Sequence, residues 1–373
     1  MLRRLYVHNY RCLENFELKL EDMHSVLLIG RNGSGKTTVG AALEVLQMIA
    51  RGSNRVGGLI RPSDLSMGRS QVPMRFELEV DLEGAVFSYT LALEFPEGFR
   101  ELRVLEEWLT VDGTDVFSRE AARVTVERPG WDSSSSFGID WHLVALPIVQ
   151  LPSRNDEVRR FSEWLANALI LQPIPQGMKG ESETETLQPD RHVENLGEWI
   201  SGVLVSAPSV YARMESYLKQ VMPDFLAIKN PTVGARGRDL SVQFGEKKDF
   251  VELPFEHLSD GEKCFLVFAL AMAANEEYGP LLCFWDEPDN FLAPSEVSPS
   301  IMMLRKSFER SGGQLVVTSH NPEAIRRFSD ENTLVLYRNS HQEPTQARSV
   351  ADIRAAGDVH GDLVGALLRG DVA

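Results

Sequence analysis

A glycine-rich motif places the strongest constraint on how this chain can fold. Residues 30–37 read GRNGSGKT and fit the pattern G-x-x-x-x-G-K-[ST] at every defined position. The apolar run at 25–29 predicts a buried strand, and the residues after the motif carry an apolar stripe at helical spacing: Val39, Leu43, Leu46 and Ala50. A strand, a glycine turn and a helix N-terminus together form a cradle of backbone N–H groups for phosphates. The sequence therefore predicts a nucleoside triphosphate site in an α/β fold.

Individual side chains of this motif have predictable tasks. Lys36 should place its ammonium group against the β- and γ-phosphates. Thr37 should give its hydroxyl to Mg²⁺, a hard ion that prefers oxygen ligands. The predicted nucleotide-binding residues of this segment are Gly30, Asn32, Gly33, Ser34, Gly35, Lys36, Thr37 and Thr38.

Two apolar segments in the last third of the chain lead into polar residues. Residues 281–285 predict a buried strand that delivers Asp286 and Glu287 at its carboxyl end, where open α/β sheets place their ligands. Asp286 should hold the Mg²⁺ shell, and Glu287 should polarise the attacking water. Residues 314–318 predict a second strand, and His320 beyond it can hydrogen-bond to the γ-phosphate. The predicted catalytic residues are Lys36, Glu287 and His320.

A further motif, LSDGEK at residues 258–263, precedes the apolar helical segment 265–274. Ser259 can cap that helix, and Glu262 lies at capping-box spacing, so the segment by itself also fits an ordinary well-capped helix. The same arrangement creates an anion-binding helix N-terminus. Such a helix start can bind a γ-phosphate that a second subunit offers.

The middle of the chain differs from its two ends. Residues 74–80, 86–95, 102–111 and 123–127 alternate in the manner of strands separated by turns, which predicts an antiparallel meander. Eleven of the 19 prolines lie between Pro73 and Pro231, which excludes a long coiled-coil arm there. The sequence predicts three parts: an ATP-binding core formed by 1–70 with 245–373, an antiparallel β insertion at 71–150 and a helical lobe at 151–244. The helices expected in the lobe are 156–169, 196–206 and 211–221.

Charge and hydropathy exclude some functions. The chain has 38 Lys and Arg against 54 Asp and Glu, a formal net charge of -16, so it is not a general DNA coat, although a local basic groove stays open. Its apolar stretches are far shorter than the roughly 20 residues of a membrane span, and the N-terminus lacks the features of a signal peptide. We expect a cytoplasmic protein without membrane association.

The motifs GRNGSGKTT, LSDGEK, FWDEPDN and VVTSHNP, in this order, resemble the ABC-type ATPase head shared by RecF, SMC and OLD-family proteins. The chain is most similar to standalone AAA-type ATPases of the RecF/OLD-like class, as found in phage-defence systems. This resemblance implies a P-loop fold with an ABC-like mixed sheet, an antiparallel β subdomain and a helical signature lobe. It implies ATP and Mg²⁺ as cofactors. It also implies an ATP-sandwich homodimer, or a higher oligomer, in which Ser259, Gly261 and Glu262 of one protomer approach the nucleotide that Lys36 of the other holds.

Two positions depart from the pattern of this class. Ala293 stands in the D-loop where the class usually has His or Asp, which puts communication between the two sites of a dimer in doubt. The position of the Q-loop glutamine is the second, and we choose Gln172 over Gln150 and Gln176. The predicted metal-site residues are then Thr37, Asp286 and Gln172.

The expected function is an ATP-binding and ATP-hydrolysing switch that closes into a dimer around ATP. It would control a separate effector, such as a nuclease or toxin, in phage defence or genome maintenance, with DNA or RNA as a further candidate partner. The 53 residues after His320 are too few for the nuclease domain of OLD proteins. The alternatives are the ATPase subunit of a membrane transporter, which the 223 positions between Lys36 and Ser259 disfavour, and a DNA-binding RecF-like repair factor.

Overall fold

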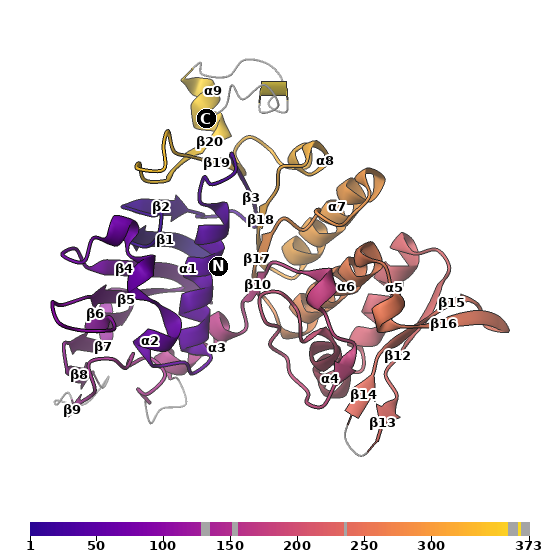
Figure 1. Ribbon diagram of the computed structural model, residues 1–373, viewed down its shortest axis with the longest axis horizontal. Helices are drawn as coiled ribbons and strands as arrows, with labels where there is room; N and C mark the ends of the chain where they lie inside the picture. Colours follow the sequence, from indigo (N-terminus) through magenta and orange to yellow (C-terminus); the bar gives the residue numbers. More distant parts are fainter. Residues whose placement is uncertain (128–134, 151–155, 235–236, 357–364, 367–373) are drawn as a thin grey trace. The chain divides into compact units, whose positions relative to one another are not determined.

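The structure is a computed structural model of the 373-residue chain, and it describes residues 1–127, 135–150, 156–234, 237–356 and 365–366. The chain forms two compact units. Unit 1 contains residues 1–23, 28–168 and 330–373, and unit 2 contains residues 24–27 and 169–329. The change from one unit to the other falls within strand β3 (Ser25–Ile29), the predicted strand before the glycine-rich motif. Figure 1 labels the elements.

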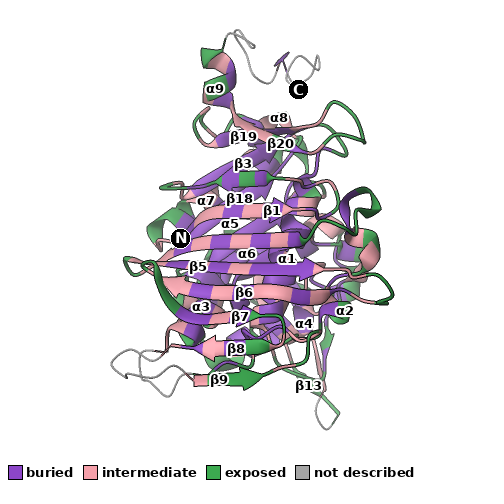
Figure 2. Ribbon diagram, turned by 90° about the vertical axis from the view of Figure 1, so that its left-hand side faces the viewer, coloured by how far each residue is buried: buried purple, intermediate pink, exposed green. Residues whose placement is uncertain are grey.

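Unit 1 is built on an eight-stranded sheet with the order β2-β1-β4-β5-β6-β7-β8-β9, in which all neighbours pair antiparallel. Buried and less buried residues alternate along β4, as in a strand with one covered face. Figure 2 shows this banding on several strands of the sheet. The strands are β1 (Leu2–His8), β2 (Phe16–Lys19), β4 (Met74–Leu82), β5 (Ala85–Glu94), β6 (Arg103–Val111), β7 (Thr114–Glu120), β8 (Arg123–Val126) and β9 (Ser135–Gly138).

The predicted antiparallel meander is confirmed by β4, β5, β6 and β8. Strand β7 was not predicted, because its sequence TDVFSRE carries two adjacent apolar residues rather than a clear alternation. Its pairing with β6 and β8 makes it a strand. The sheet also takes in β1 and β2 from the N-terminus. The expected three-part functional division of the chain stays a prediction.

Helix α3 packs on the sheet of unit 1 and holds α1 beside it. The ring of Phe161 on α3 lies 6.2 Å from that of Phe87 and 5.5 Å from that of Tyr89 on β5, measured between centroids. Gln47 on α1 donates to the carbonyl oxygen of Ala168 just after α3. The other elements of unit 1 are α1 (Lys36–Ala50), α2 (Val56–Leu59), η1 (Pro62–Asp64), η2 (Ser66–Gly68), α3 (Glu157–Ala166), β19 (Thr333–Tyr337), β20 (Gln346–Ser349) and α9 (Val350–Ala355).

Unit 2 contains three parallel strands in the order β10-β17-β18. The residues at the start of β3 lie next to β18, since Leu315 N donates to His24 O at 2.8 Å. The strands and 3₁₀ turns of this unit are β10 (Leu169–Leu171), η3 (Pro175–Gly177), β11 (Glu181–Ser182), β12 (Phe225–Lys229), β13 (Thr232–Val233), β14 (Gly237–Asp239), β15 (Ser241–Glu246), β16 (Asp249–Pro254), η4 (Phe255–His257), β17 (Leu282–Asp286) and β18 (Gln314–Thr318).

Helix α6 forms the centre of unit 2. It has 19 residues and is buried from Lys263 to Asn275, as expected of a helix that is apolar on all sides. Phe268 on α6 lies 4.5 Å from Trp285 on β17, between ring centroids, so α6 packs directly on the strand that ends in the acidic pair. The helices are α4 (Leu196–Ser206), α5 (Val210–Val221), α6 (Asp260–Tyr278), α7 (Pro294–Arg310) and α8 (Pro322–Ile325). The expected α/β class is confirmed.

Candidate functional site

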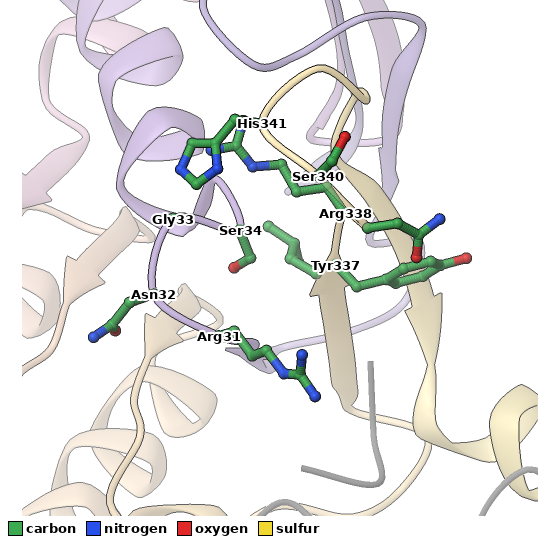
Figure 3. A pocket seen from close by; sticks show the side chains of 10 residues that line it. Arg31, Asn32, Gly33, Ser34, Tyr337, Arg338, Ser340 and His341 are labelled. Carbon is green, nitrogen blue, oxygen red and sulfur yellow. The ribbon is translucent and has the colours of Figure 1, made fainter.

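The predicted phosphate loop lies in unit 1, between the end of β3 and the start of α1 (Figure 3). Three of its glycines have positive φ angles: 151° at Gly30, 79° at Gly33 and 105° at Gly35. A Cβ atom on Gly30 would stand 2.1 Å from the carbonyl oxygen of Leu336, and one on Gly35 would stand 2.7 Å from Thr345 Oγ1. Backbone conformation and space therefore both require glycine at these two positions.

The start of α1 has the features of an anion site. Gly35 provides no side-chain cap, and the first turn contains no acidic residue. The first backbone N–H groups and the positive end of the helix dipole are therefore not neutralised by the helix's own side chains. Lys36 is 6% exposed, and its Nζ donates to the carbonyl oxygens of Gly30 at 2.8 Å and Arg31 at 3.4 Å. The ammonium group thus lies across the loop.

The remaining loop residues differ in exposure. Asn32, Gly33 and Thr37 are exposed, so a ligand can reach them, whereas Ser34 is buried. Thr38 is half-buried, and its Oγ1 accepts a hydrogen bond from Cys12 Sγ at 3.6 Å. Unit 1 thus carries the predicted nucleotide-binding residues 30–38 on one turn and the helix that follows it.

The predicted acidic pair lies in unit 2, at the carboxyl end of β17. Asp286 is 3% exposed, and Thr318 Oγ1 donates to its Oδ1 at 2.5 Å. The same hydroxyl accepts from the Glu287 backbone N–H at 3.0 Å. Thr318 therefore holds both acidic residues at the strand end. The sequence analysis did not single out Thr318, whose signal is its place at the end of the strand that pairs with β17.

Glu287 is fixed by its backbone and by two neighbouring side chains. Its φ is 50°, in the left-handed region that residues other than glycine seldom adopt, and such conformations concentrate at functional sites. Asn290 Nδ2 donates to Glu287 Oε2 at 2.6 Å, and His320 Nε2 lies 3.4 Å from Glu287 Oε1. The Glu287 side chain is 32% exposed, so its carboxylate is both held and accessible. The structure thus brings two predicted catalytic residues, Glu287 and His320, together.

A third carboxyl group, Asp289, ties the turn after β17 to the segment after β18. Burial raises its pKa, and the nearby charge of Glu287 acts in the same direction. Hydrogen bonds from Ser319 and Asn321 act in the opposite direction. Asn290 is therefore a support of Glu287, and Asp289 links this turn to the segment after β18; the sequence analysis recognised neither role.

The LSDGEK motif forms the start of α6, and the predicted capping box is present. Glu262 N donates to Ser259 Oγ at 3.3 Å, and Ser259 N donates to Glu262 Oε2 at 2.7 Å. The Ser259 hydroxyl also donates to Glu262 Oε2, at 2.8 Å. Ser259 is nevertheless exposed, and Gly261 and Glu262 are partly exposed, so the helix tip is accessible from outside the unit. Gly261 keeps the tip free of a side chain.

Gln172, the chosen Q-loop residue, directly follows β10. Leu171 pairs with Trp285 in the parallel register of β10 and β17. Gln172 and Asp286 are the residues that follow this pair, so both lie at the carboxyl ends of neighbouring strands. The alternative Gln176 donates instead to Asp260 Oδ2 at the start of α6. The metal-binding role of Gln172 stays a prediction.

The described residues contain no cluster of three or more His, Cys, Asp or Glu side chains that could hold a metal ion. This is compatible with Mg²⁺, which commonly takes one or two carboxylates and completes its shell with substrate phosphates and water. Within the same residues, no helix has the length and apolar character needed to cross a membrane.

Comparisons with solved structures identify the fold. An SMC head bound to the C-terminal winged-helix domain of ScpA matches with a TM-score of 0.58 and 13% identity, covering 94% of this chain and 99% of that one. The SMC head with an extended coiled coil bound to the C-terminal domain of ScpA, from Pyrococcus furiosus, matches with a TM-score of 0.56 and 12% identity, covering 95% and 98%. The fold is therefore that of an SMC-type ATPase head.

Comparisons of sequence agree with this fold. The energy-coupling factor transporter ATP-binding protein EcfA of Methanosphaera stadtmanae is 24% identical over 201 residues, which make up 53% of this chain and 69% of that protein. Residues 25–326 match the AAA_21 family model, described as "AAA domain, putative AbiEii toxin, Type IV TA system". This match spans the phosphate loop, the LSDGEK motif, the acidic pair and His320. The chain belongs to the AAA_21 family and is a P-loop ATPase of the ABC/SMC type.

Proposed function

We propose that the chain hydrolyses Mg²⁺·ATP. The phosphate loop of unit 1 binds the triphosphate through Lys36 and the backbone N–H groups at the start of α1. Glu287 of unit 2 orients the attacking water, and His320 hydrogen-bonds to the γ-phosphate. The observation that carries this proposal is the arrangement of Glu287, held at 2.6 Å by Asn290 and lying 3.4 Å from His320.

The residues present fit a magnesium ion. Asp286 offers a buried carboxylate oriented by Thr318, and Thr37 offers an exposed hydroxyl. These are hard oxygen donors of the kind that Mg²⁺ prefers, with Gln172 as a further donor at the end of the neighbouring strand. When bound, the ion would offset the negative charge of the phosphates. Asp286 and Thr37 would be its protein ligands.

We further propose that ATP closes two copies of the chain head to head. The exposed N-terminus of α6, with Ser259 and Gly261, would contact the γ-phosphate held by the partner's loop. ADP lacks that phosphate, so the contact differs between the two nucleotides, and only such a difference can shift an open–closed equilibrium. ATP would therefore favour the dimer, and hydrolysis would release it.

The test uses the Glu287→Gln variant, which keeps the shape of the side chain and loses the carboxylate. We expect it to bind ATP, to hydrolyse it at least about 100-fold more slowly and to accumulate as a dimer in light scattering. Lys36→Ala is the control and should stay monomeric because it does not bind ATP. A monomeric Glu287→Gln protein with ATP bound would contradict the dimer, whereas unimpaired hydrolysis would contradict the role of Glu287.

The biological role that we propose is control of a separate effector protein, such as a nuclease or toxin, in phage defence or genome maintenance. Three observations support it: the family description names a toxin of a toxin–antitoxin system, the similar SMC heads are bound to ScpA, and the net charge of -16 favours a protein partner over nucleic acid. Affinity purification of Glu287→Gln with ATP should capture the effector. Binding to DNA or RNA that weakens steeply with salt would instead favour a RecF-like role.

The match to EcfA favours one other candidate, an ATPase subunit of a membrane transporter. The eight-stranded sheet and the 223 positions between Lys36 and Ser259 argue against it. Co-purification of the chain with a membrane protein would reverse this preference.

A further inference from the structure

We propose that unit 1 carries a second anion site, on the side of the phosphate loop that faces the segment after β19, and that it binds a single phosphate group. A pocket lies there between residues 31–34 of the loop and residues 336–341 (Figure 3). Lys36 and Thr37 do not line this pocket. The pocket therefore shares Asn32, Gly33 and Ser34 with the predicted nucleotide-binding residues but does not include the start of α1.

Two nitrogen-bearing side chains, Arg338 and His341, converge on the loop from the segment after β19. A Cβ atom placed on Gly33 would stand 3.6 Å from Arg338 Nη2 and 3.9 Å from His341 Nε2. Figure 3 shows the two side chains next to each other beside Gly33. Both groups therefore lie at the wall of the loop, next to Gly33.

The charge of this pocket is opposite to that of the chain as a whole. Its lining includes Arg31, Arg338 and His341 and no carboxylate, although the chain has a net charge of -16. Within the part of the chain that the structure describes, neither Arg338 nor His341 forms an ion pair with a carboxylate. An anionic ligand would supply the missing negative charge.

Ser34, which is also one of the predicted nucleotide-binding residues, gives a second sign of a ligand. The residue is 3% exposed and lines the pocket, and its Oγ has no hydrogen-bond partner among the described residues. Buried hydroxyl groups in folded proteins nearly always have a partner, because an unpaired one is unfavourable. A ligand oxygen in the pocket would provide it.

The donors define the chemical class of the ligand. A guanidinium, an imidazole and a hydroxyl approach from different elements, which suits the several oxygens of a tetrahedral phosphate better than a flat carboxylate. The source is either inorganic phosphate or the terminal phosphate of a nucleic acid strand. A phosphate bound here would link residues 338–341 to the loop and so stabilise the conformation in which the loop holds a nucleotide.

The test titrates inorganic phosphate into the full chain by calorimetry, with the phosphate loop saturated by Mg²⁺·ADP. We expect one phosphate per chain, bound at least about tenfold more weakly by Arg338→Gln and by His341→Gln. Arg123→Gln, which removes an exposed charge on β8, is the matched control and should bind as the wild type does. An unchanged ADP affinity in Arg338→Gln shows that the loop is intact.

Two further arms separate the possible explanations. Lys36→Ala should lose ADP binding and keep phosphate binding, so this site and the proposed ATP site can fail independently. A further arm compares a 5′-phosphorylated oligonucleotide with the same oligonucleotide without the phosphate. If the phosphorylated form binds more tightly to the wild type but not to Arg338→Gln, the source is the end of a nucleic acid strand. If the two oligonucleotides bind equally, the source is free phosphate. Equal phosphate binding by wild type and Arg338→Gln means an adventitious ion only. The proposal would be overturned by this equal binding. It would also be overturned by phosphate binding that occurs only in the absence of ADP, or by a loss of ADP affinity in Arg338→Gln.

Discussion

At the scale of single residues, the acidic pair depends on neighbours that contribute no obvious chemistry of their own. Thr318 uses one hydroxyl to hold the Asp286 carboxylate and the Glu287 backbone. Asn290 holds the Glu287 carboxylate. A water-orienting group is effective only when its own position is fixed, because misplacement costs rate without affecting substrate binding. If Glu287 has the proposed role, Asn290 is its positioning residue.

Replacing Asn290 should separate positioning from nucleotide binding. In Asn290→Ala the Glu287 carboxylate loses its 2.6 Å hydrogen bond, and we expect kcat for ATP hydrolysis to fall about tenfold with KM unchanged. Asn290→Asp cannot donate to Glu287 and repels it, so its kcat should be lower still. Steady-state phosphate release at varied Mg²⁺·ATP measures both constants. A wild-type kcat in Asn290→Ala would show that Glu287 needs no such support.

Asp289 predicts a pH dependence of stability. Burial raises its pKa in the folded chain above the ordinary 3.8, which applies to the unfolded chain. At a pH between the unfolded and the folded pKa, the folded chain therefore binds more protons than the unfolded chain. This proton binding stabilises the folded chain fully below the pKa that Asp289 has in the unfolded chain. The stabilisation is lost as the pH rises through the pKa that Asp289 has in the folded chain. The stability of the wild type relative to Asp289→Asn should therefore fall from about pH 4 upward. Urea unfolding of both proteins between pH 4 and 8 measures this difference, and parallel profiles would contradict it.

At the scale of elements, the phosphate loop is shaped by the strand beside it. Gly30 faces the carbonyl oxygen of Leu336 on β19, so the fit depends on backbone atoms, which cannot rotate away as a side chain can. The start of α6 shows the reverse situation, because its shape comes from its own side chains, Ser259 and Glu262. The loop therefore needs its tertiary neighbour, whereas the helix tip is prepared locally.

This difference predicts a large effect of one methyl group. In Gly30→Ala the added Cβ would stand 2.1 Å from Leu336 O at a φ of 151°, so the loop must shift. We expect ADP to bind at least about tenfold more weakly, in line with the cost of a strained backbone position. Gly58→Ala on α2 is the control, since nothing lies within 4 Å of its Cβ position. Titration with a fluorescent ADP analogue compares the two, and equal affinities would disprove the close fit at Gly30.

At the scale of the whole molecule, the proposed sandwich divides each ATP site between two copies. Lys36 on one chain and Ser259 on the other would serve the same nucleotide. In a symmetric dimer each copy contributes both parts, one to each site. Two chains with different defects can therefore form one intact site.

Mixing defective chains tests this arrangement directly. Lys36→Ala lacks the phosphate-binding ammonium, and Ser259→Asp keeps a good helix cap but places a negative charge toward the triphosphate. Each alone should be nearly inactive, whereas an equal mixture should regain up to about half of wild-type ATPase activity, since each mixed dimer has one intact site of two. Ser259→Asn, of the same size without the charge, is the control for shape. No recovery in a mixture that forms mixed dimers would rule out shared sites.

The local parts of this protein follow from its sequence. The spacing of glycines, Lys36 and Thr37 predicts the loop, and the capping-box spacing of Ser259 and Glu262 predicts the start of α6, because each depends on residues a few positions apart. The apolar runs before Asp286 and His320 likewise predict the two strands, both of which are present. The family resemblance rests on the same local motifs.

Other features depend on contacts between distant positions, which no local pattern records. Thr318 meets Asp286 because β17 and β18 pair in one particular register, and Arg338 meets Gly33 because the chain after β19 returns to the phosphate loop. Strand β7 exists because β6 and β8 offer it hydrogen bonds on both sides. The sequence by itself therefore determined the motifs to which we assign the nucleotide chemistry, since each motif is encoded in a few neighbouring residues. Only the tertiary structure decided which side chains support them, because strand register and loop path bring those side chains together.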